Sequence, residues 1–309
     1  MTETMNRTAT WTNIGTSVLN AKNIDDVLRE ASLDYTVEKQ KMQTENGLII
    51  PGRVATIAKY EDGTERYLGD VSDRYEICQN RDAFSFVDEI HDDMKFLKAG
   101  ETHNGMIYVI GQLPSIDVLG DEVTPHVILQ NGHNGRFQMK STIIPLRVVC
   151  QNQFNTAFKE SPNTISIIHS QQLESKILMA KKLLSGAADY MEHFKSNAEM
   201  LAGVKCGREA CIKIIEDYFM QNLKTEEMSQ HQIDKVQEKI SRMKIAYNAE
   251  DNQNFNGTVY GLVNAFTDYN THKEIRPSDK SEDSKFLTVT FNPLALSAFT
   301  QFALERAVA

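Results

Sequence analysis

The chain has 309 residues, of which 41% are hydrophobic and 24% charged, and its formal net charge is −9. This composition excludes an intrinsically disordered chain, and the acidic balance excludes a protein that coats nucleic acid with its whole surface. Because the chain has no apolar run that could cross a bilayer and its polar start lacks a secretory pattern, we expect a cytoplasmic protein.

A short helix followed by a β-meander is predicted for the first part of the chain. Asn23 or Asp25 can cap a helix that ends near Leu33. Turn signals at residues 46–47 and 61–63 then separate three stretches of alternating or β-branched residues. These stretches predict three consecutive antiparallel strands.

A helix and a second group of strands are predicted next. After Gln79, where Asn80 or Asp82 can cap the start, apolar residues recur at helical spacing: Phe84, Val87, Ile90 and Met94. Strands are then expected over residues 105–113, 123–131 and 137–149, with a glycine-rich turn at residues 131–135 and a helix candidate at residues 150–158.

The apolar period becomes helical after Ser170. The long helix predicted there has a heptad seam formed by Leu173, Ile177, Ala180, Leu184, Ala187, Met191 and Phe194. Apolar spacing predicts further helices over residues 211–219, 233–247, 257–272 and after Pro293. Such runs usually pack together as a hairpin or bundle, and the alternatives are a helix bound in a partner's groove or a seam between copies of the chain in a homo-oligomer.

These elements predict an α+β fold, with antiparallel β-meander units, intervening helices and a largely helical C-terminal region. We expect an α+β core domain over residues 1–169 and a helical hairpin or bundle over residues 170–250. Residues 251–309 are expected to form helices that pack back on the core.

Motifs for catalysis or cofactor binding are not found. The cysteines are scattered and suggest neither disulfides nor a zinc site: Cys78, Cys150, Cys206 and Cys211. There is no phosphate-binding, dinucleotide-binding or zincin motif, so no cofactor and no metal are expected and the catalytic residues, if any, are unknown. His126 and His133 can act as bases or ligands, although a structural role in the turn is the default for His133.

Several ordered phrases carry a resemblance to a known family. They are ASLDYTVE from Ala31, LGDVSDRYEICQNRDAFSFVD from Leu68, NGHNG from Asn131, LRVVCQNQFNTAF from Leu146 and NGTVYGLVNAFTDYNTH from Asn256. The chain resembles the domain of unknown function 932 family of phage- and plasmid-like proteins over roughly residues 11–272. The resemblance implies a mobile-element protein in the host cytoplasm. Asn134 stands where the family usually has aspartate, which weakens any acidic catalytic role there.

The clearest electrostatic feature is a stretch without acidic residues between Glu122 and Glu160. Its basic residues are Arg136, Lys140, Arg147 and Lys159. Strand alternation places Arg136 and Lys140 on one face, whereas Arg147 has the opposite parity unless Pro145 resets the strand. Such a face can follow a phosphate backbone, and a solvated sheet face is the alternative.

The β-meander carries basic residues as well. Arg53, Lys59, Arg66 and Arg74 alternate with carboxylates in the sequence, which is typical of ordinary surface. Tyr67 and Tyr75 are interpreted as packing residues rather than as platforms for bases.

Three functional hypotheses follow. The first is a single-stranded DNA binding or annealing protein, because the order of elements is similar to that of phage recombination proteins. The second is a host-interaction or anti-defence protein that binds host proteins through its acidic surface or helices. The third, an enzyme that uses His133, lacks an identifiable partner for the base.

Overall fold

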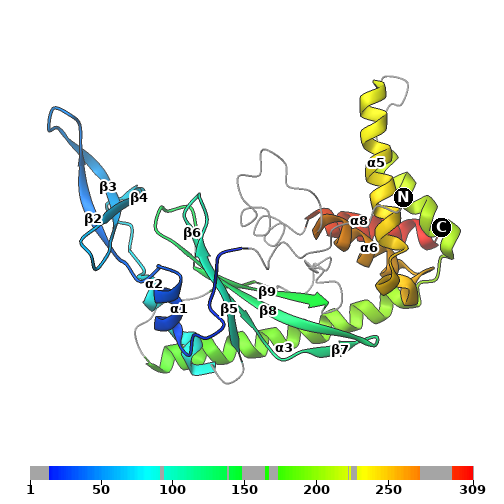
Figure 1. The fold of residues 1–309 in the computed structure, drawn as a ribbon, viewed down its shortest axis with the longest axis horizontal. Helices are drawn as coiled ribbons and strands as arrows, with labels where there is room; N and C mark the ends of the chain where they lie inside the picture. Colours follow the sequence, from blue (N-terminus) through cyan, green and yellow to red (C-terminus); the bar gives the residue numbers. More distant parts are fainter. Residues whose placement is uncertain are drawn as a thin grey trace.

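The structure is a computed structural model that describes residues 14–90, 94–137, 139–147, 164–166, 173–221, 223, 228–271 and 294–308. Two antiparallel sheets occupy the N-terminal half and helices dominate the C-terminal half (Figure 1). The predicted α+β class is therefore confirmed. The helix candidate at residues 150–158 lies outside the described residues.

The smaller sheet is the predicted meander. Its three strands are hydrogen-bonded in the order β2-β3-β4, and they are β2 (Thr36–Gln43), β3 (Ile49–Lys59) and β4 (Glu65–Ser72). The outer part of the β2–β3 hairpin projects away from the body of the protein (Figure 1). Among the described strands β4 pairs only with β3, so within this part of the chain the other side of β4 is an edge of the sheet.

The larger sheet has seven antiparallel strands. Its hydrogen-bonded order is β1-β5-β6-β8-β9-β10, and β7 pairs with an extension of β8. The strands are β1 (Thr16–Ser17), β5 (Lys95–Glu101), β6 (Met106–Gln112), β7 (Ile116–Val118), β8 (Asp121–Gly132), β9 (Lys140–Arg147) and β10 (Thr164–Ser166). The glycine-rich turn follows β8, and the predicted third strand begins only at Lys140.

Both helical segments predicted for the N-terminal half are present, and the second differs in form from the prediction. Asn23 caps α1 (Ile24–Glu30), and its side chain accepts a hydrogen bond from the backbone N–H of Asp26 at 3.0 Å. The helix predicted after Gln79 is instead a single turn, α2 (Asn80–Phe84), followed by the 3₁₀ helix η2 (Ser85–Ile90). Residues 83–87 are all buried, so this segment lacks the solvent face of the predicted amphipathic helix.

Neither of the predicted caps of this segment, Asn80 or Asp82, holds the cap position. Gln79 holds the cap position of α2 without a side-chain bond, and the Asn80 side chain is turned into the core. There its amide Nδ2 donates to the backbone carbonyl of Leu33 at 2.9 Å. The buried carbonyl of Leu33 needs a hydrogen-bond donor, and the Asn80 amide supplies it. This need explains why Asn80 lies in the core instead of capping the helix.

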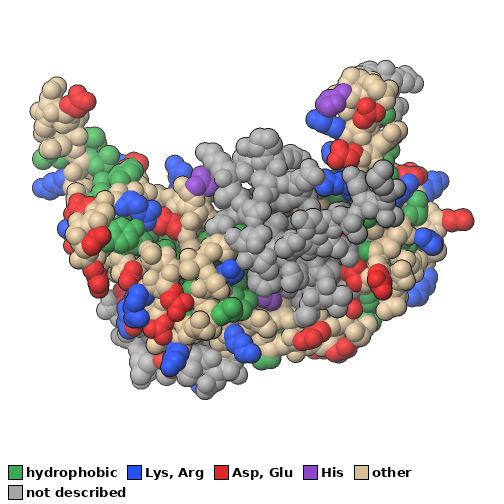
Figure 2. Space-filling view, in the orientation of Figure 1, with side chains coloured by type: hydrophobic (Ala, Val, Ile, Leu, Met, Phe, Trp, Pro, Cys, Tyr) green, Lys and Arg blue, Asp and Glu red, His purple; other side chains and the backbone are tan. Residues whose placement is uncertain are grey.

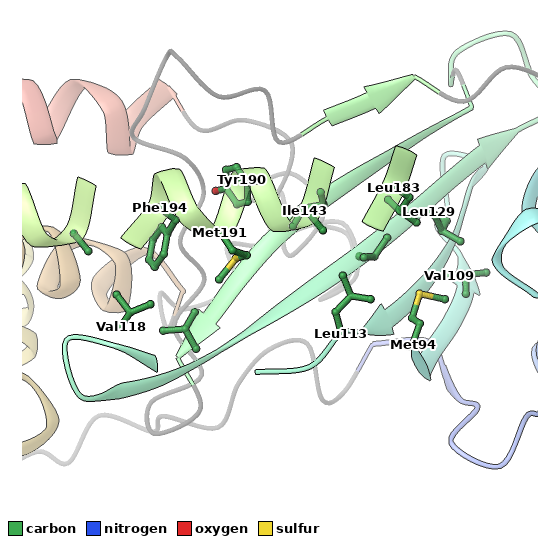
Figure 3. Packing of buried hydrophobic residues seen from close by; sticks show 14 of the residues in the cluster. Met94, Val109, Leu113, Val118, Leu129, Ile143, Leu183, Tyr190, Met191 and Phe194 are labelled. Carbon is green, nitrogen blue, oxygen red and sulfur yellow. The ribbon is translucent and has the colours of Figure 1, made fainter. Parts of the chain in front are cut away.

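The C-terminal half is built on one long helix. The helices are α3 (Leu173–Gly203), α4 (Arg208–Met220), α5 (Gln230–Tyr247), η4 (Glu250–Phe255), α6 (Val259–Thr271) and α8 (Leu294–Val308). From the predicted seam, Ala187, Met191 and Phe194 are buried, with Leu183 in place of Leu184. This stripe faces the large sheet, and α3 contacts β9 and α6 (Figure 3).

One cluster of buried apolar side chains connects the parts of the fold. It includes Ala58 of the small sheet, Val109 and Ile143 of the large sheet, and Phe266 and Phe299 of the helices. Phe266 and Phe299 stack with ring centroids 4.3 Å apart, which holds α6 against α8. None of the helices in the described part of the chain is both long and apolar enough to cross a membrane.

Candidate functional site

A polar cleft of about 1030 Å³ lies where the two sheets meet. One wall is β4, and the other walls are the turn between β5 and β6 and the end of the glycine-rich turn. The lining residues are Arg53, Arg66–Tyr75 except Asp73, Glu101–Gly105 and Asn134–Arg136. We call this region the arginine cleft, because four arginines line it against two carboxylates.

Two of the four arginines are neutralised. Arg53 forms an ion pair with Asp70 of β4, which lies diagonally across the strand pair because Arg53 itself is in register with Ser72. Arg66 donates from Nη1 and Nη2 to the two carboxylate oxygens of Glu101, at 3.1 Å and 2.6 Å, and this pairing raises the pKa of the Arg66 guanidinium. Since both carboxylates are already engaged, neither adds an uncompensated negative charge to the cleft.

The other two arginines keep their charge available. Arg74 and Arg136 are exposed, and neither makes an ion pair within the part of the chain that the structure describes. Figure 2 shows basic and acidic side chains mixed over the visible face of the protein. A net positive cleft on a chain of net charge −9 is thus a local departure from its surroundings.

An aromatic ring stands beside these charges. Tyr67 lines the cleft with 58% of its surface exposed, and its hydroxyl donates to Asp70 Oδ1 at 3.4 Å. Partial burial and the Asp70 charge raise the pKa of Tyr67, and the positive charges of Arg53 and Arg136 oppose this shift. Arg136 therefore lies within electrostatic range of the ring. An exposed ring flanked by guanidinium groups can stack on a base while the arginines bind phosphates.

The position of Arg136 is fixed by close backbone contacts of the glycine-rich turn. Asn134 donates from Nδ2 to the carbonyl of Asn104 at 2.8 Å and accepts from the N–H of Arg136 at 3.1 Å. A Cβ at Gly69 would lie 2.6 Å from the Cβ of Asn134, so only glycine allows β4 to approach the turn so closely. The glycine-rich turn therefore contacts the large sheet through Asn104 and the small sheet through Gly69.

His133 has a structural environment in this turn. It is buried, its Nε2 lies 2.9 Å from Oδ1 of Asn80, and its carbonyl accepts a hydrogen bond from Thr56 Oγ1 at 2.8 Å. Because Asn80 Oδ1 is an acceptor, Nε2 carries the proton. Burial, with a smaller effect from Arg66, lowers the pKa of His133 to about 4. His133 does not line the arginine cleft.

His126 is likewise enclosed, in β8. Its Nδ1 lies 3.0 Å from the carbonyl of Thr124, and burial lowers the pKa of the ring to about 4. Cys150, which the sequence places near these histidines, lies outside the described residues. Within the described ranges, no cluster of three His, Cys, Asp or Glu side chains is arranged to hold a metal ion.

The structure separates the basic residues that the sequence grouped on one strand face. Arg136 lies in the turn before β9 and lines the cleft, whereas Lys140 begins β9, is half-buried and has its pKa lowered by burial. Arg147 ends β9 in unbroken register with Val123, so Pro145 does not reset the strand. At about 3.3 Å per residue, its backbone is about 23 Å from that of Lys140. Lys159 lies outside the described residues.

Sequence reasoning missed the other residues of the cleft. The sequence indicated ordinary surface for Arg53, Arg66 and Arg74, because carboxylates alternate with them, and a packing role for Tyr67. In the structure Asp70 pairs with Arg53 and Glu101 pairs with Arg66, so the charges of the other two cleft arginines are not balanced by these carboxylates. Only the pairing of β3 with β4 and the approach of the glycine-rich turn bring these residues together.

Comparison with known proteins gives one match. A sequence model of the family described as "Domain of unknown function (DUF932)" matches residues 67–289. The chain belongs to the DUF932 family. The DUF932 match begins at Tyr67, so of the four arginines that line the cleft it includes Arg74 and Arg136 but not Arg53 or Arg66.

The other comparisons add no relative. No curated protein and no solved structure matches the chain significantly. Of the phrases that carry the resemblance, ASLDYTVE precedes the matched range, LGDVSDRYEICQNRDAFSFVD begins one residue inside it, and the later ones lie within it. The DUF932 assignment is confirmed, and a function has to be argued from the cleft itself.

Proposed function

We propose that the chain binds single-stranded DNA in the arginine cleft, as a mobile-element protein that promotes strand annealing during recombination. The observation that carries the proposal is the placement of Arg74 and Arg136, both without ion pairs among the described residues, on the same cleft as the exposed ring of Tyr67. Phosphate neutralisation and base stacking are the two contributions that bind a single strand without regard to its sequence.

The shape of the cleft supports a single strand over a duplex. Its polar walls come from a sheet edge and two turns, and no helix of the lining is available to enter a major groove. An unpaired strand exposes both its bases and its phosphates, so it can contact Tyr67 and the arginines at the same time. Annealing also needs several copies of the chain on one strand, and assembly as a homo-oligomer is part of the proposal.

The test is the binding of a labelled oligodeoxythymidine to the whole chain by fluorescence anisotropy over a range of salt concentrations. For single strands, the slope of log K against log salt changes by about 0.7 for each phosphate contact. An Arg74→Ala/Arg136→Ala variant should bind more weakly and show a slope that is shallower by about 1.4. Both side chains are exposed, so the variant is expected to fold.

A matched control removes the same charge elsewhere. Lys181 and Lys182 are exposed on α3, and a Lys181→Ala/Lys182→Ala variant has the same net charge as the cleft variant. It should keep the slope of the parent chain. If the two variants lose affinity equally, binding is a property of total charge and the cleft is not the site. If the parent chain does not bind at low salt, the proposal is wrong.

A protein partner is the second candidate, because β4 offers a free sheet edge along the same cleft. A host protein can add an extended strand there through backbone hydrogen bonds, with acidic side chains toward the arginines. A competition experiment with the labelled oligonucleotide distinguishes the two candidates. A polyglutamate peptide that displaces the oligonucleotide only at concentrations far above that of unlabelled DNA favours the nucleic acid, and the reverse order favours the protein partner.

A further inference from the structure

The exposed ring of Tyr67 is hydrogen-bonded to the strand that carries it. Its hydroxyl donates to Oδ1 of Asp70, and the other carboxylate oxygen, Oδ2, accepts from Nη2 of Arg53. The same Nη2 donates to the backbone carbonyl of Asp70 at 3.0 Å. Arg53 therefore binds both the side chain and the backbone of Asp70, and Asp70 in turn binds the hydroxyl of the ring. An exposed side chain without such a partner changes rotamer within nanoseconds.

A β-bulge brings Tyr67 and Asp70 to one face of the small sheet. These residues are three apart, so regular alternation would place them on opposite faces of β4. The register of β4 on β3 shifts by one residue at Leu68. Tyr67 therefore pairs with Ile57 of β3. Asp70 pairs with Ala55, which is two residues from Ile57 and shares its face. Bulges commonly redirect side chains next to functional sites, and here the bulge makes the hydrogen bond between the ring and the carboxylate possible.

The Arg53–Asp70 pair contributes geometry rather than charge. The hydrogen bond and the charge of Arg53 lower the pKa of Asp70, so the carboxylate is ionised at neutral pH. A carboxylate without a partner would repel a phosphate, and the guanidinium of Arg53 offsets this repulsion. The charge of Arg136 also acts on Tyr67, and Arg136 makes no ion pair among the described residues. The phosphate beside a stacked base is thus left to Arg136, and the Arg53–Asp70 pair holds the ring.

A ring that is already held loses less freedom when it binds. Ordering one mobile side chain at an interface lowers affinity by about twofold to tenfold. Tyr67 is 58% exposed although its hydroxyl is engaged, so the ring is accessible to a base. The hydrogen bond uses the edge of the ring, whereas stacking uses its face.

We propose that Asp70, held by Arg53, is a positioning residue that fixes the ring of Tyr67 for stacking on an unpaired base. This inference rests on the proposed function, since the base belongs to the single strand in the arginine cleft. It names the part of the ligand that the cleft recognises in addition to phosphate. The cleft therefore prefers a nucleic acid to a polyanion without bases.

The experiment compares the affinity of the full chain for a labelled oligodeoxythymidine with its affinity for an abasic strand of the same length. Both strands carry the same phosphates, so the ratio of the two affinities measures the preference for bases. The parent chain should show a preference of about tenfold, which is the size of one stacked base. Tyr67→Ala should abolish the preference. Tyr67→Phe keeps the ring but removes the hydroxyl, and it should lower the preference about threefold.

Two substitutions of Asp70 separate its position from its charge. Asp70→Ala removes the contact with the ring and should lower the preference as Tyr67→Phe does. The double variant Tyr67→Phe/Asp70→Ala should lower it no further, because both changes break the same hydrogen bond. Asp70→Asn removes the same charge, but its amide still bonds to the hydroxyl, so it should keep the preference of the parent chain. Both substitutions should strengthen binding of the abasic strand by a similar factor, since both release the charge of Arg53.

Asp25→Ala is the matched control. Asp25 forms an ion pair with Arg81 at exposures similar to those of the Arg53–Asp70 pair, and neither residue lines the cleft, so this variant should keep the preference. Such exposed pairs contribute little to stability, so the variants are expected to fold.

The positioning role is refuted, and single-strand binding stands, if Tyr67→Phe and Asp70→Ala keep the preference of the parent chain. The same holds if Asp70→Asn loses the preference as fully as Asp70→Ala does. A parent chain that binds both strands equally has no stacking ring, which overturns the inference and leaves only phosphate binding. If the parent chain binds neither strand, the proposed function fails as well.

Discussion

Replacing Gly69 by alanine tests how closely the small sheet approaches the glycine-rich turn. On an ordinary strand this change stabilises a protein, by about 0.4–1 kcal/mol, because alanine restricts the unfolded chain. Here the added Cβ would lie 2.6 Å from Cβ and 2.9 Å from Cα of Asn134, and the second of these atoms belongs to the backbone. Overpacking of this kind costs about 1–3 kcal/mol, so the clash outweighs the gain.

Thermal unfolding followed by circular dichroism measures the effect. A loss of about 1–3 kcal/mol corresponds to a melting temperature lower by roughly 1.5–5 °C for a chain of this size. Gly203, near the end of α3, has no atom within 4 Å of an added Cβ, so Gly203→Ala should melt at or above the temperature of the parent chain. Adding Asn134→Gly to Gly69→Ala removes the closest atom and should recover about 1 kcal/mol beyond additivity.

The reasoning is refuted if Gly69→Ala melts within about 1 °C of the parent chain. In that case β4 does not press against the turn, and the walls of the arginine cleft are not fixed relative to each other. A destabilised Gly69→Ala that shows no coupling to Asn134→Gly would place the strain elsewhere in the small sheet. Only a loss of stability together with coupling supports the observed geometry.

Two further predictions concern the titration and the charge of the site. The pKa of His133 is about 4 in the folded chain and about 6.5 in the unfolded chain. As the pH falls, the unfolded chain therefore binds the proton first, and the free energy of unfolding decreases between these two pH values. The decrease is about 2 kcal/mol at pH 5. Urea titrations at pH 7.5 and 5 should show that His133→Gln lacks this part of the fall, while the exposed control His231→Gln retains it. Glu101→Gln removes the partner of Arg66 and should tighten oligonucleotide binding a few-fold at low salt, while lowering stability by about 1 kcal/mol. Unchanged or weaker binding by Glu101→Gln would show that the Arg66 charge does not reach the ligand.

Local patterns in the sequence predicted the elements well. The cap at Asn23 depends on residues within one helical turn, and the meander depends on two turn signals and on strand alternation, all of which are short-range features. The apolar stripe of α3 also follows from its period. These predictions are confirmed because neighbouring residues decide them.

The positions of Asn80 and Arg136 depend on long-range packing, which the sequence pattern does not show. Asn80 looked like a cap because its role in the core depends on Leu33 and His133, which lie 47 and 53 residues away. Arg136 was grouped with Lys140 by strand alternation, yet β9 begins after Arg136, and the turn carries it to β4 instead. Alternation holds only inside a strand, and nothing in the local pattern marks where β9 starts.

The length of α3 fixes the distance between the two ends of the protein. Its 31 residues form a rod of about 46 Å at 1.5 Å per residue, with η2 and β9 packed along one part and α6 along another. Fluorophores placed near the hairpin and near α5 should therefore report one constant separation with and without DNA. A molecule that engages both ends has to bridge that gap, because the rod prevents the ends from approaching each other.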